Sequence, residues 1–461
     1  MAYRWITSVL VLIGVWSLLL GAAWAAEKTE KSLAEHLLEI MRAQGTISEM
    51  QYLELREVAV AERKTMTDVA AKSDSDISVK WKDGLVFENP AHDFSMQVGG
   101  RIQIDAAIAG EDSSTRSALG LTHDDFGSGS EFRRSRIYIK GQVAENVKYK
   151  AEYDFAGGDS DFKDVYIQFT GIPWLKQVTV GHVKEPFSIE ELTSSRFLTF
   201  MERGLPNLFS PSRNTGILFS GNCDCFDMPW TWALGGFRDT DGFGNGFGDS
   251  EYNVTARLTG APIYSDEGRR VLHLGFSYSH KFISNETIAY ASTPEAHLLP
   301  KYLNTDPNGS GTIAANAVDL INPELALVLG PFSLQGEYMY AAVDSNGSSD
   351  LDFHGWYGSA SYFLTGENRN YSKKKAAFGR IKPSRNFSFK NKTPGAWEIA
   401  GRYSHVDLDD DGIKGGDLKD WTVALNWYLN PFTRIMLNYV RADLDDGGDT
   451  NIFETRFQVD F

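Results

Sequence analysis

Over the last four-fifths of the chain, apolar and polar residues alternate with a period of two in many separate segments. In one early segment, Ile102 and Ile104 alternate with Arg101, Gln103 and Asp105. Successive side chains of a β-strand point to opposite faces, so this pattern predicts strands with one apolar face and one hydrated face. A chain built from such strands has to find a place for a continuous apolar surface.

The last ten residues carry the clearest form of this pattern. One face holds Phe453, Thr455, Phe457, Val459 and Phe461, and the other holds Glu454, Arg456, Gln458 and Asp460. The chain ends on an aromatic residue, which is the form of terminal strand that the outer-membrane assembly machinery is expected to read. A soluble sheet has no reason to end this way.

Segments of this kind number about sixteen, an even number as bacterial membrane barrels require. The expected strands are 94–108, 132–143, 147–156, 162–170, 177–183, 215–221, 230–237, 251–260, 271–282, 321–329, 332–343, 353–365, 395–406, 418–429, 432–442 and 452–461. Short turns alternate with long polar connections such as Gly110–Ser130, Asp239–Ser250 and Asp407–Asp417. We therefore expect an all-β fold over residues 94–461, a closed antiparallel transmembrane β-barrel.

A soluble antiparallel sandwich is the alternative to a barrel. In a sandwich the polar face lies in solvent and the apolar face covers a packed core. Here the polar rows carry many long charged residues, while the apolar rows are nearly all aromatic or branched aliphatic. Lipid outside and water inside the barrel explains this division better.

The N-terminus has the form of an export signal over residues 1–25. Arg4 supplies a positive flank, an apolar run extends from about Val9 to Leu20, and Ala23-Trp24-Ala25 has the small-x-small form of a cleavage site. A membrane anchor helix is the alternative, but the run is short for a span. A cleaved signal peptide followed by a barrel places the mature protein in the outer membrane of a Gram-negative bacterium.

Residues 26–66 form a candidate helical hairpin or short coiled coil. Leu33, Leu37 and Ile40 recur at helical spacing, and Thr46-Ile47-Ser48-Glu49 has the form of a capping box with Thr46 as N-cap. Such a module buries little by itself, so it is expected to associate with a neighbour or to serve as a spacer. Residues 67–93 are expected to form a linker.

Composition excludes several classes of function. The net charge of −16 argues against nucleic acid as a partner, because phosphate binding by a protein surface needs an excess of Lys and Arg. Cys223 and Cys225 are the only cysteines, which excludes a disulfide framework. A bridge across one residue would be strained, so a local feature of a turn is favoured over a metal or redox role. We find no catalytic, metal-binding or phosphate-loop motif, and expect neither an enzyme nor a cofactor.

Strand alternation also predicts which charged residues face the lumen. The basic ones are Arg101, Arg134, Arg136, Lys140, Lys148, Lys150, Arg257, Arg402 and Arg456. The acidic ones are Asp105, Glu152, Asp154, Asp164, Glu337, Glu398 and Glu454. Six of the basic residues belong to the first three strands, which indicates a basic sector suited to anions. A wall of mixed charge with weak selectivity is the alternative.

Two connections are candidates for pore elements. The segment from Lys184 to Asn214 is too apolar to lie in solvent, so we expect it to fold inward as a constriction loop. The turn from Gly366 to Pro394 is strongly basic. It is expected either to form an anion funnel on the periplasmic side or to remain a solvated charge run.

At this point the sequence resembles the phosphate-selective porins O and P. The matching stretches are Gly99-Gly100-Arg101-Ile102-Gln103, Phe132-Arg133-Arg134, Val147-Lys148-Tyr149, Glu190–Arg203, Thr365-Gly366-Glu367, Gly395-Ala396-Trp397-Glu398 and Asn426-Trp427-Tyr428. The resemblance implies a homotrimer of sixteen-stranded barrels with an inward third loop and a ladder of arginines. It also implies that Arg101, Arg133, Arg134 and Lys148 are ladder or constriction residues.

The same resemblance implies that Asp164, Ser194 and Arg203 belong to a central anion site. One position departs from the family, because Glu191 stands where phosphate-specific members have a lysine. A carboxylate there would repel a phosphate dianion. The first hypothesis is therefore a water-filled porin for small solutes with some preference for anions such as phosphate.

Two alternatives remain in the same barrel fold. One is a weakly selective general porin, and the other is a structural outer-membrane protein whose N-terminal helices contact the cell wall. Acidic outward loops fit divalent-cation bridging to lipopolysaccharide among the outer-membrane lipids, although ordinary solubility explains them equally well.

Overall fold

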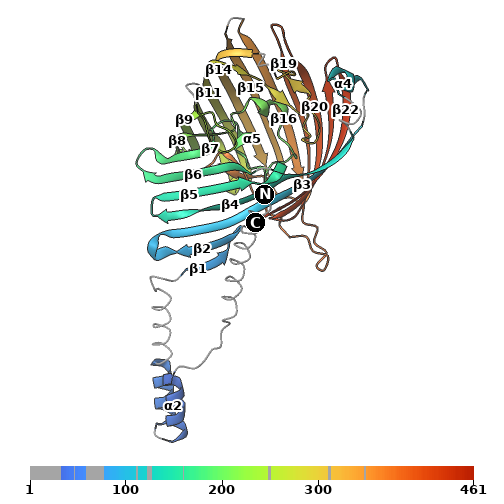
Figure 1. Cartoon of the computed structure of the whole chain (residues 1–461). Helices are drawn as coiled ribbons and strands as arrows, with labels where there is room; N and C mark the ends of the chain where they lie inside the picture. Colours follow the sequence, from blue (N-terminus) through green and yellow to red (C-terminus); the bar gives the residue numbers. More distant parts are fainter. Residues whose placement is uncertain are drawn as a thin grey trace, which may run out of the picture. The chain divides into compact units, whose positions relative to one another are not determined.

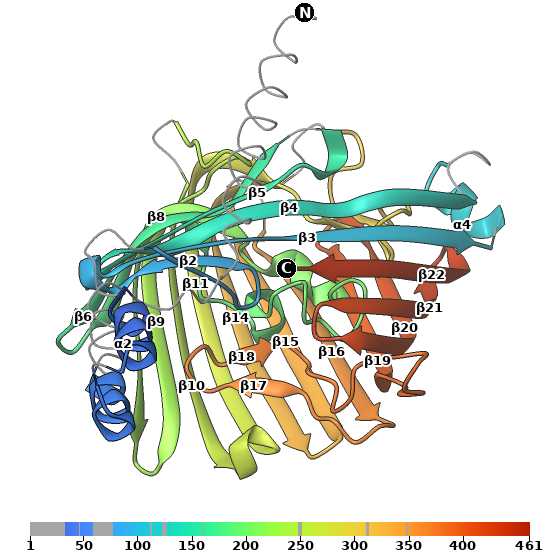
Figure 2. The same cartoon turned by 90° about the horizontal axis from the view of Figure 1, so that it is seen from below.

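The computed structural model describes residues 33–45, 47–58, 77–110, 113–121, 127–158, 160–247, 251–309, 313–346 and 349–461. The chain divides into two units, residues 1–76 and residues 77–461. The second unit is a closed antiparallel barrel (Figures 1 and 2). The expected signal peptide lies outside the described residues.

Sixteen strands form the barrel, and each expected strand is present. They are β3 (Phe94–Ala109), β4 (Ser128–Ala144), β5 (Val147–Asp154), β6 (Asp161–Ile172), β7 (Lys176–Lys184), β8 (Arg213–Cys225), β9 (Met228–Arg238), β10 (Tyr252–Ser265), β11 (Arg270–Ile288), β14 (Ile313–Leu329), β15 (Phe332–Ser345), β16 (Leu351–Phe363), β19 (Ala396–Asp410), β20 (Ile413–Asn430), β21 (Thr433–Leu444) and β22 (Gly448–Asp460). The last strand closes the ring by pairing with the first, from Ile452 opposite Ala109 to Asp460 opposite Arg101.

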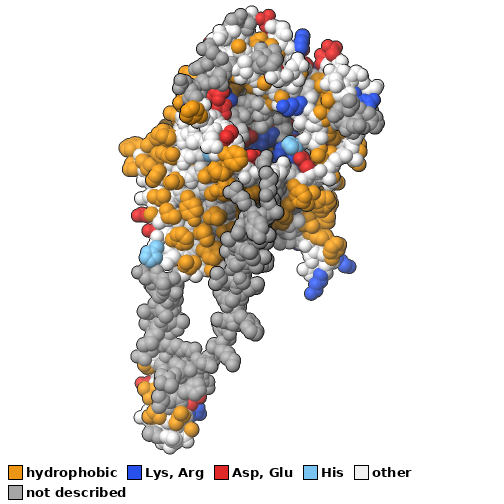
Figure 3. All heavy atoms as spheres, in the orientation of Figure 1, with side chains coloured by type: hydrophobic (Ala, Val, Ile, Leu, Met, Phe, Trp, Pro, Cys, Tyr) orange, Lys and Arg blue, Asp and Glu red, His pale blue; other side chains and the backbone are white. Residues whose placement is uncertain are grey.

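The alternation predicted from the sequence separates an outer apolar row from an inner polar row. On β3 the inward residues Arg101 and Asp105 are buried, whereas Ile104 and Ile108 on the other face are exposed. Hydrophobic side chains cover much of the visible outer wall in Figure 3. A surface of this kind suits lipid, because membrane barrels turn their apolar residues outward.

Two short strands precede the barrel within the expected linker of residues 67–93, of which residues 67–76 lie outside the described part of the chain. β1 (Ser78–Trp81) pairs with β2 (Leu85–Asn89), and β2 continues the sheet by pairing with the start of β3. The end of the chain meets β3 beside this hairpin, where Phe461 and Gly100 exchange backbone hydrogen bonds of 2.8 and 3.1 Å. A side chain at Gly99 would collide with the Phe461 carbonyl, which explains the glycine at this position.

The connections differ from the expectation at one place. Residues Asp407–Asp417 do not form a long loop, because β19 and β20 extend toward each other and leave only Asp411-Gly412 as a turn. Both residues have positive φ, 34° and 89°, as tight hairpins with an Asp-Gly pair require. Cys223 and Cys225, near the turn between β8 and β9, are bonded to each other. The disulfide bond that the short spacing of the two cysteines argued against is therefore present.

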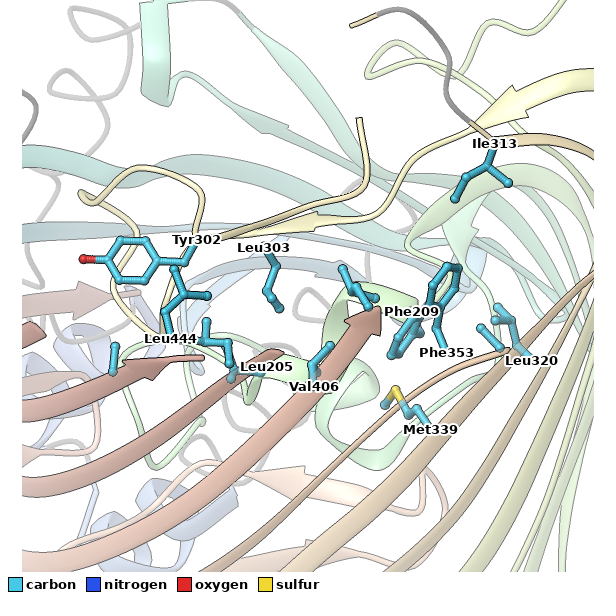
Figure 4. Close-up of a cluster of buried hydrophobic side chains, with 14 of the residues drawn as sticks. Leu205, Phe209, Tyr302, Leu303, Ile313, Leu320, Met339, Phe353, Val406 and Leu444 are labelled. Atoms are coloured by element: carbon cyan, nitrogen blue, oxygen red, sulfur yellow. The ribbon is translucent and has the colours of Figure 1, made fainter. Parts of the chain in front are cut away.

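Three connections fold into the barrel. They are the loop of residues 185–212, which contains α5 (Ile189–Leu192) and η4 (Leu205–Phe209); the loop of residues 289–312, with β12 (Ala291–Ser292) and β13 (Leu303–Asn304); and the first half of the turn between β16 and β19, with β17 (Asn370–Ser372) and β18 (Ala377–Gly379). Together with inward side chains of the strands, the first two form an apolar core that includes Leu205, Phe209, Leu303, Met339 and Phe353 (Figure 4). Part of the lumen is thus dry.

The described part of the N-terminal unit has two helical stretches, α2 (Leu33–Ala43) and residues 49–58. The expected N-cap Thr46 lies outside the described residues. Ser48 and Gln51 form the reciprocal capping pair instead, with bonds of 2.9 and 3.3 Å. Among the described residues, no helix is both long and apolar enough to cross a membrane.

Candidate functional site

The loop of residues 185–212 lies inside the barrel, as its apolar sequence predicts. Phe187, Ile189 and Met201 are fully buried. The backbone N–H groups of Ile189 and Glu190 donate to the buried carboxylate of Glu337 on β15, at 3.2 and 3.0 Å. The loop therefore crosses the lumen and narrows it.

Arginines of the later strands hold the far side of this loop by its carbonyl groups. Arg402 donates to the Glu202 carbonyl at 3.0 Å and Arg434 donates to that of Leu198 at 2.6 Å. Arg402 also pairs with Glu295 at 2.5 Å and with Glu190 at 3.2 Å. These guanidinium groups already bind partners within the protein. Strand alternation alone therefore predicts too many cations that could bind a passing solute.

Arg133 and Arg134 both point toward the loop because β4 contains a bulge. The register places Arg134 opposite Gln103 and Phe132 opposite Ile104, which leaves Arg133 as the extra residue. A bulge allows two consecutive side chains to reach the same face. Arg133 binds the carboxylate of Glu202 with two bonds of 2.9 Å, and Arg134 lies 3.7 Å from it.

Glu202 is the loop residue on which these arginines converge. Arg456 of β22 also binds it, at 2.7 Å, and pairs with Asp105 at 2.6 Å. Burial opposes the charge of Glu202, but Arg133, Arg134 and Arg456 outweigh it and hold the pKa of the carboxyl well below its usual range. Glu202 and Asp105 therefore neutralise much of the charge of the three guanidinium groups.

Further along the wall toward the short turns, Arg101 and Arg136 are neighbours in register. Arg101 pairs with Glu152 and donates to the hydroxyls of Ser195 at 2.6 Å and Ser194 at 3.5 Å. Arg136 pairs with Asp154 at 2.6 Å. The structure thus brings the predicted residues Arg101, Arg136 and Ser194 together.

The predicted residue Asp164 on β6 bridges two cations. Its carboxylate accepts from Lys150 at 2.5 Å and from Arg213 at 2.7 Å. The side chain of Asp164 is 22% exposed and that of Lys150 is 16% exposed, whereas the side chains of Arg402 and Arg456 are 0% exposed. Water therefore reaches these residues of β5 and β6 more readily than Arg402 of β19 or Arg456 of β22. We call β4–β6 the hydrated wall, although Arg134 and Glu152 on it are buried.

Glu191, the residue that departs from the resemblance, is neutralised within the loop. Its carboxylate lies 2.7 Å from the ammonium group of Lys184 and 3.1 Å from the guanidinium group of Arg203. Burial again opposes the charge, but Arg203 and Lys184 lower the pKa of Glu191 to about 2. Arg203 also donates to the carbonyls of Glu190, Glu191 and Thr193, which fixes it to the loop.

A group of cations surrounds the ring of Tyr138 on β4. The distances to the ring centroid are 5.3 Å for Lys140, 5.9 Å for Lys150 and 5.8 Å for Arg196. Lys375, from the turn between β16 and β19, is close enough to Lys150 and Arg196 for their charges to repel it, and the carboxylate of Asp164 attracts it. In the part of the chain that the structure describes, neither Lys140 nor Lys375 forms an ion pair. We call these four cations the Tyr138 cluster.

The Tyr138 cluster combines expected and unexpected residues. Alternation placed Lys140 and Lys150 on the wet face, but Arg196 and Lys375 belong to connections without periodicity, so the sequence could not place them beside β4. Lys148 lies apart, exposed near the short-turn end of β5 and opposite Gln142. The basic turn is divided: Tyr371, Phe378, Arg380 and Ile381 are buried, whereas Lys374, Lys375 and the basic residues after Ile381 are exposed.

Comparisons with known proteins agree with this geometry. The family model for phosphate-selective porins O and P matches residues 96–461. Porin O of Pseudomonas aeruginosa is 28% identical over 428 residues, covering 84% of this chain and 93% of the relative. An uncharacterized protein of Caulobacter vibrioides is 28% identical over 425 residues, covering 88% of this chain and 81% of the relative.

Among solved structures, a loop-deletion variant of the outer membrane protein OmpT of Vibrio cholerae has the same fold. It superimposes with a TM-score of 0.51 at 10% identity, covering 80% of this chain and all of that one.

Proposed function

Since the chain belongs to the phosphate-selective porin O and P family, we propose that it selects phosphate-like anions at the Tyr138 cluster. The chain is an outer-membrane channel with a preference for anions. The proposal concerns the place in the channel where that preference for anions arises. Its principal support is that Lys140 and Lys375 carry charges that no carboxylate pairs with in the described part of the chain.

Phosphate recognition needs several N–H donors in a place with surplus positive charge. Most arginines of the lumen already have carboxylate partners, which reduces what they can offer to a passing anion. The Tyr138 cluster differs because two of its four cations are unpaired and because it lies on the hydrated wall. A partly desolvated anion would meet donors there without having to displace a carboxylate from all of them.

The remaining predicted residues form a path toward this cluster. From the long-loop end, an anion would meet Arg133 and Arg134 at Glu202, then Arg101 and Arg136, and then the Tyr138 cluster. Lys148 would be met last, near the short-turn mouth. Several weak sites in sequence favour conduction, since an ion has to enter each site and also leave it.

Glu191 does not oppose this assignment. Its charge is compensated by Lys184 and Arg203, so it adds little repulsion at the Tyr138 cluster. We propose that Glu191 stiffens the loop by fixing Arg203, and that the family's lysine is replaced functionally by the cations of the cluster.

The proposal is tested by phosphate block of chloride current through the purified channel in planar bilayers. In a Lys140→Gln/Lys375→Gln variant, we expect the phosphate concentration for half-block to rise roughly tenfold or more, since a hydrogen bond from a charged donor is worth about 1.5–3 kcal/mol. Lys301→Gln/Lys414→Gln, which changes two exposed lysines on the long-loop side, is the matched control. An unchanged half-block concentration in the first variant would overturn the proposal.

We further propose that the mature protein is a homotrimer in a Gram-negative outer membrane, exported with a cleaved signal peptide and contacting lipopolysaccharide on its outer side. A trimer is consistent with the assembly of a solved porin-like protein, the trimer form of Vibrio cholerae OmpT. Mass measurement of the purified protein in detergent would test both the assembly and the removal of residues 1–25.

A further inference from the structure

The second half of the basic turn forms a small hairpin at the outer face of the barrel. Phe387 donates its N–H to the Leu429 carbonyl at 2.6 Å, and Ser388 and Thr393 exchange two backbone bonds of 3.1 Å. Residues Phe389–Lys392 form the tip. The hairpin of residues 386–394 is therefore an ordered element attached to the end of β20.

This hairpin continues the apolar outer wall. The ring of Phe387 lies 4.8 Å from that of Trp427 and 4.7 Å from that of Phe389. Trp427 stacks on Trp397 at 5.0 Å, and both indole N–H groups donate to the Pro394 carbonyl, at 2.8 and 3.2 Å. Tryptophan in this setting is typical of the boundary between lipid and water.

The tip combines an exposed aromatic ring with positive charge. Phe389 is 87% exposed, and Lys390 and Lys392 are exposed on either side of Asn391. Neither lysine forms an ion pair within the described residues. Residues 382–394 contain four basic residues and no acidic one, although the whole chain has a net charge of −16. Figure 3 shows Lys and Arg side chains at the end of this turn, below the hydrophobic outer wall.

The position of the hairpin identifies the leaflet that it meets. The turn joins β16 to β19 on the same side as the two-residue turn between β20 and β21. Short turns of bacterial outer-membrane barrels face the periplasm, where the leaflet consists of phospholipids. A ring at the acyl boundary with lysines reaching the headgroups is the usual arrangement of an interfacial anchor.

We propose that the hairpin of residues 386–394 binds anionic phospholipid of the periplasmic leaflet. Phe389 inserts at the acyl boundary, and Lys390 and Lys392 contact the headgroup phosphates. Charge complementarity and continuity with the aromatic outer wall favour lipid over a second copy of the chain. This inference is independent of anion selectivity, because none of these residues lies in the lumen.

The test uses the full-length protein in nanodiscs, with an environment-sensitive dye on a Phe389→Cys variant. The dye reacts only at this position, because Cys223 and Cys225 are bonded to each other. We expect lipids with nitroxide-labelled acyl chains to quench the dye, and to quench it more strongly in phosphatidylglycerol than in phosphatidylcholine. A dye on Phe243→Cys, in the long connection between β9 and β10, should remain unquenched.

The headgroup contact is tested by adding Lys390→Gln and Lys392→Gln. The preference for phosphatidylglycerol should fall roughly thirtyfold, since each of the two lysines near an anionic surface contributes about 1 kcal/mol. Lys414→Gln, at the opposite end of the barrel, should leave it unchanged. A dye that is not quenched by either lipid would overturn the proposal and indicate water or a second copy at the tip. Equal quenching in both lipids would overturn the headgroup assignment.

Discussion

The hydrated wall and the packed wall of this barrel share the same alternation of apolar and polar residues. They differ in whether water or an inserted loop contacts their inward side chains. On β4–β6, inward residues such as Lys140, Lys150 and Asp164 remain partly hydrated. On β19 and β22, the inward residues Arg402 and Arg456 are buried against the loops of residues 185–212 and 289–312. Alternation therefore identifies the inner face, whereas the inserted segments decide which part of that face conducts.

The chemistry of the two walls follows from this difference. A buried charge requires a partner, which Arg402 has in Glu295 of an inserted connection and Arg456 has in Asp105 of β3. A hydrated charge can remain unpaired, as Lys140 does within the described residues. The packed wall holds the constriction loop in place, and the hydrated wall offers cations to the solute.

The largest expected difference between the walls is in stability. Arg402→Ala would leave Glu295 and Glu190 buried without their cation, which should cost about 3–5 kcal/mol of unfolding free energy. Lys163→Ala removes a more exposed ion pair, with Asp161 on β6, and should cost about 1 kcal/mol or less. Urea unfolding in detergent, followed by tryptophan fluorescence, measures both. Equal losses of unfolding free energy in the two variants would contradict the distinction between a packed and a hydrated wall.

Ion selectivity should change more when a residue of the hydrated wall is substituted than when a residue of the packed wall is substituted. Lys140→Glu places a carboxylate beside Lys150 and Arg196, and we expect the anion-to-cation permeability ratio to fall several-fold with little change in stability. Reversal potentials in a KCl gradient give the ratio. Glu337→Gln on the packed wall is the comparison, and its ratio should stay close to that of the unchanged protein. A drop of the same size there would remove the special role of β4–β6.

The smallest expected effect is a loss of stability at low pH. Because the folded-state pKa of Glu191 is about 2, below its ordinary value, the ion pairs of Glu191 stabilise the loop fully above about pH 4 and are lost as pH falls toward 2. Thermal unfolding followed across this range should show a loss that Glu191→Gln reduces. If the variant and the unchanged protein lose stability in parallel, the loop does not depend on this carboxylate.

The strand framework could be predicted from the sequence because period-two alternation is local and repeats sixteen times. The inner and outer faces followed from the same signal, and the inward fold of the loop followed from its apolar composition. The extension of β19 and β20 to the Asp411-Gly412 turn was missed, because a run of aspartates looks like a loop until the paired strands supply its hydrogen bonds.

The site was less predictable, for two physical reasons. Arg133 reaches the lumen through a bulge, and a single inserted residue breaks the parity on which alternation depends. Arg196 and Lys375 lie on connections, whose positions are decided by packing between segments far apart in the chain. The apolar core inside the lumen was also missed, since inward residues such as Met339 and Phe353 belong to strands that were expected to face water.

The most direct test of this account is the chemical accessibility of the two walls in the open channel. Gln168→Cys places a thiol on the hydrated wall, and Ser404→Cys places one on the packed wall beside Glu295. A small, negatively charged thiol reagent should reduce the current through the first variant and leave the second unchanged. Reaction at Ser404→Cys as fast as at Gln168→Cys would contradict the claim that anions pass along β4–β6.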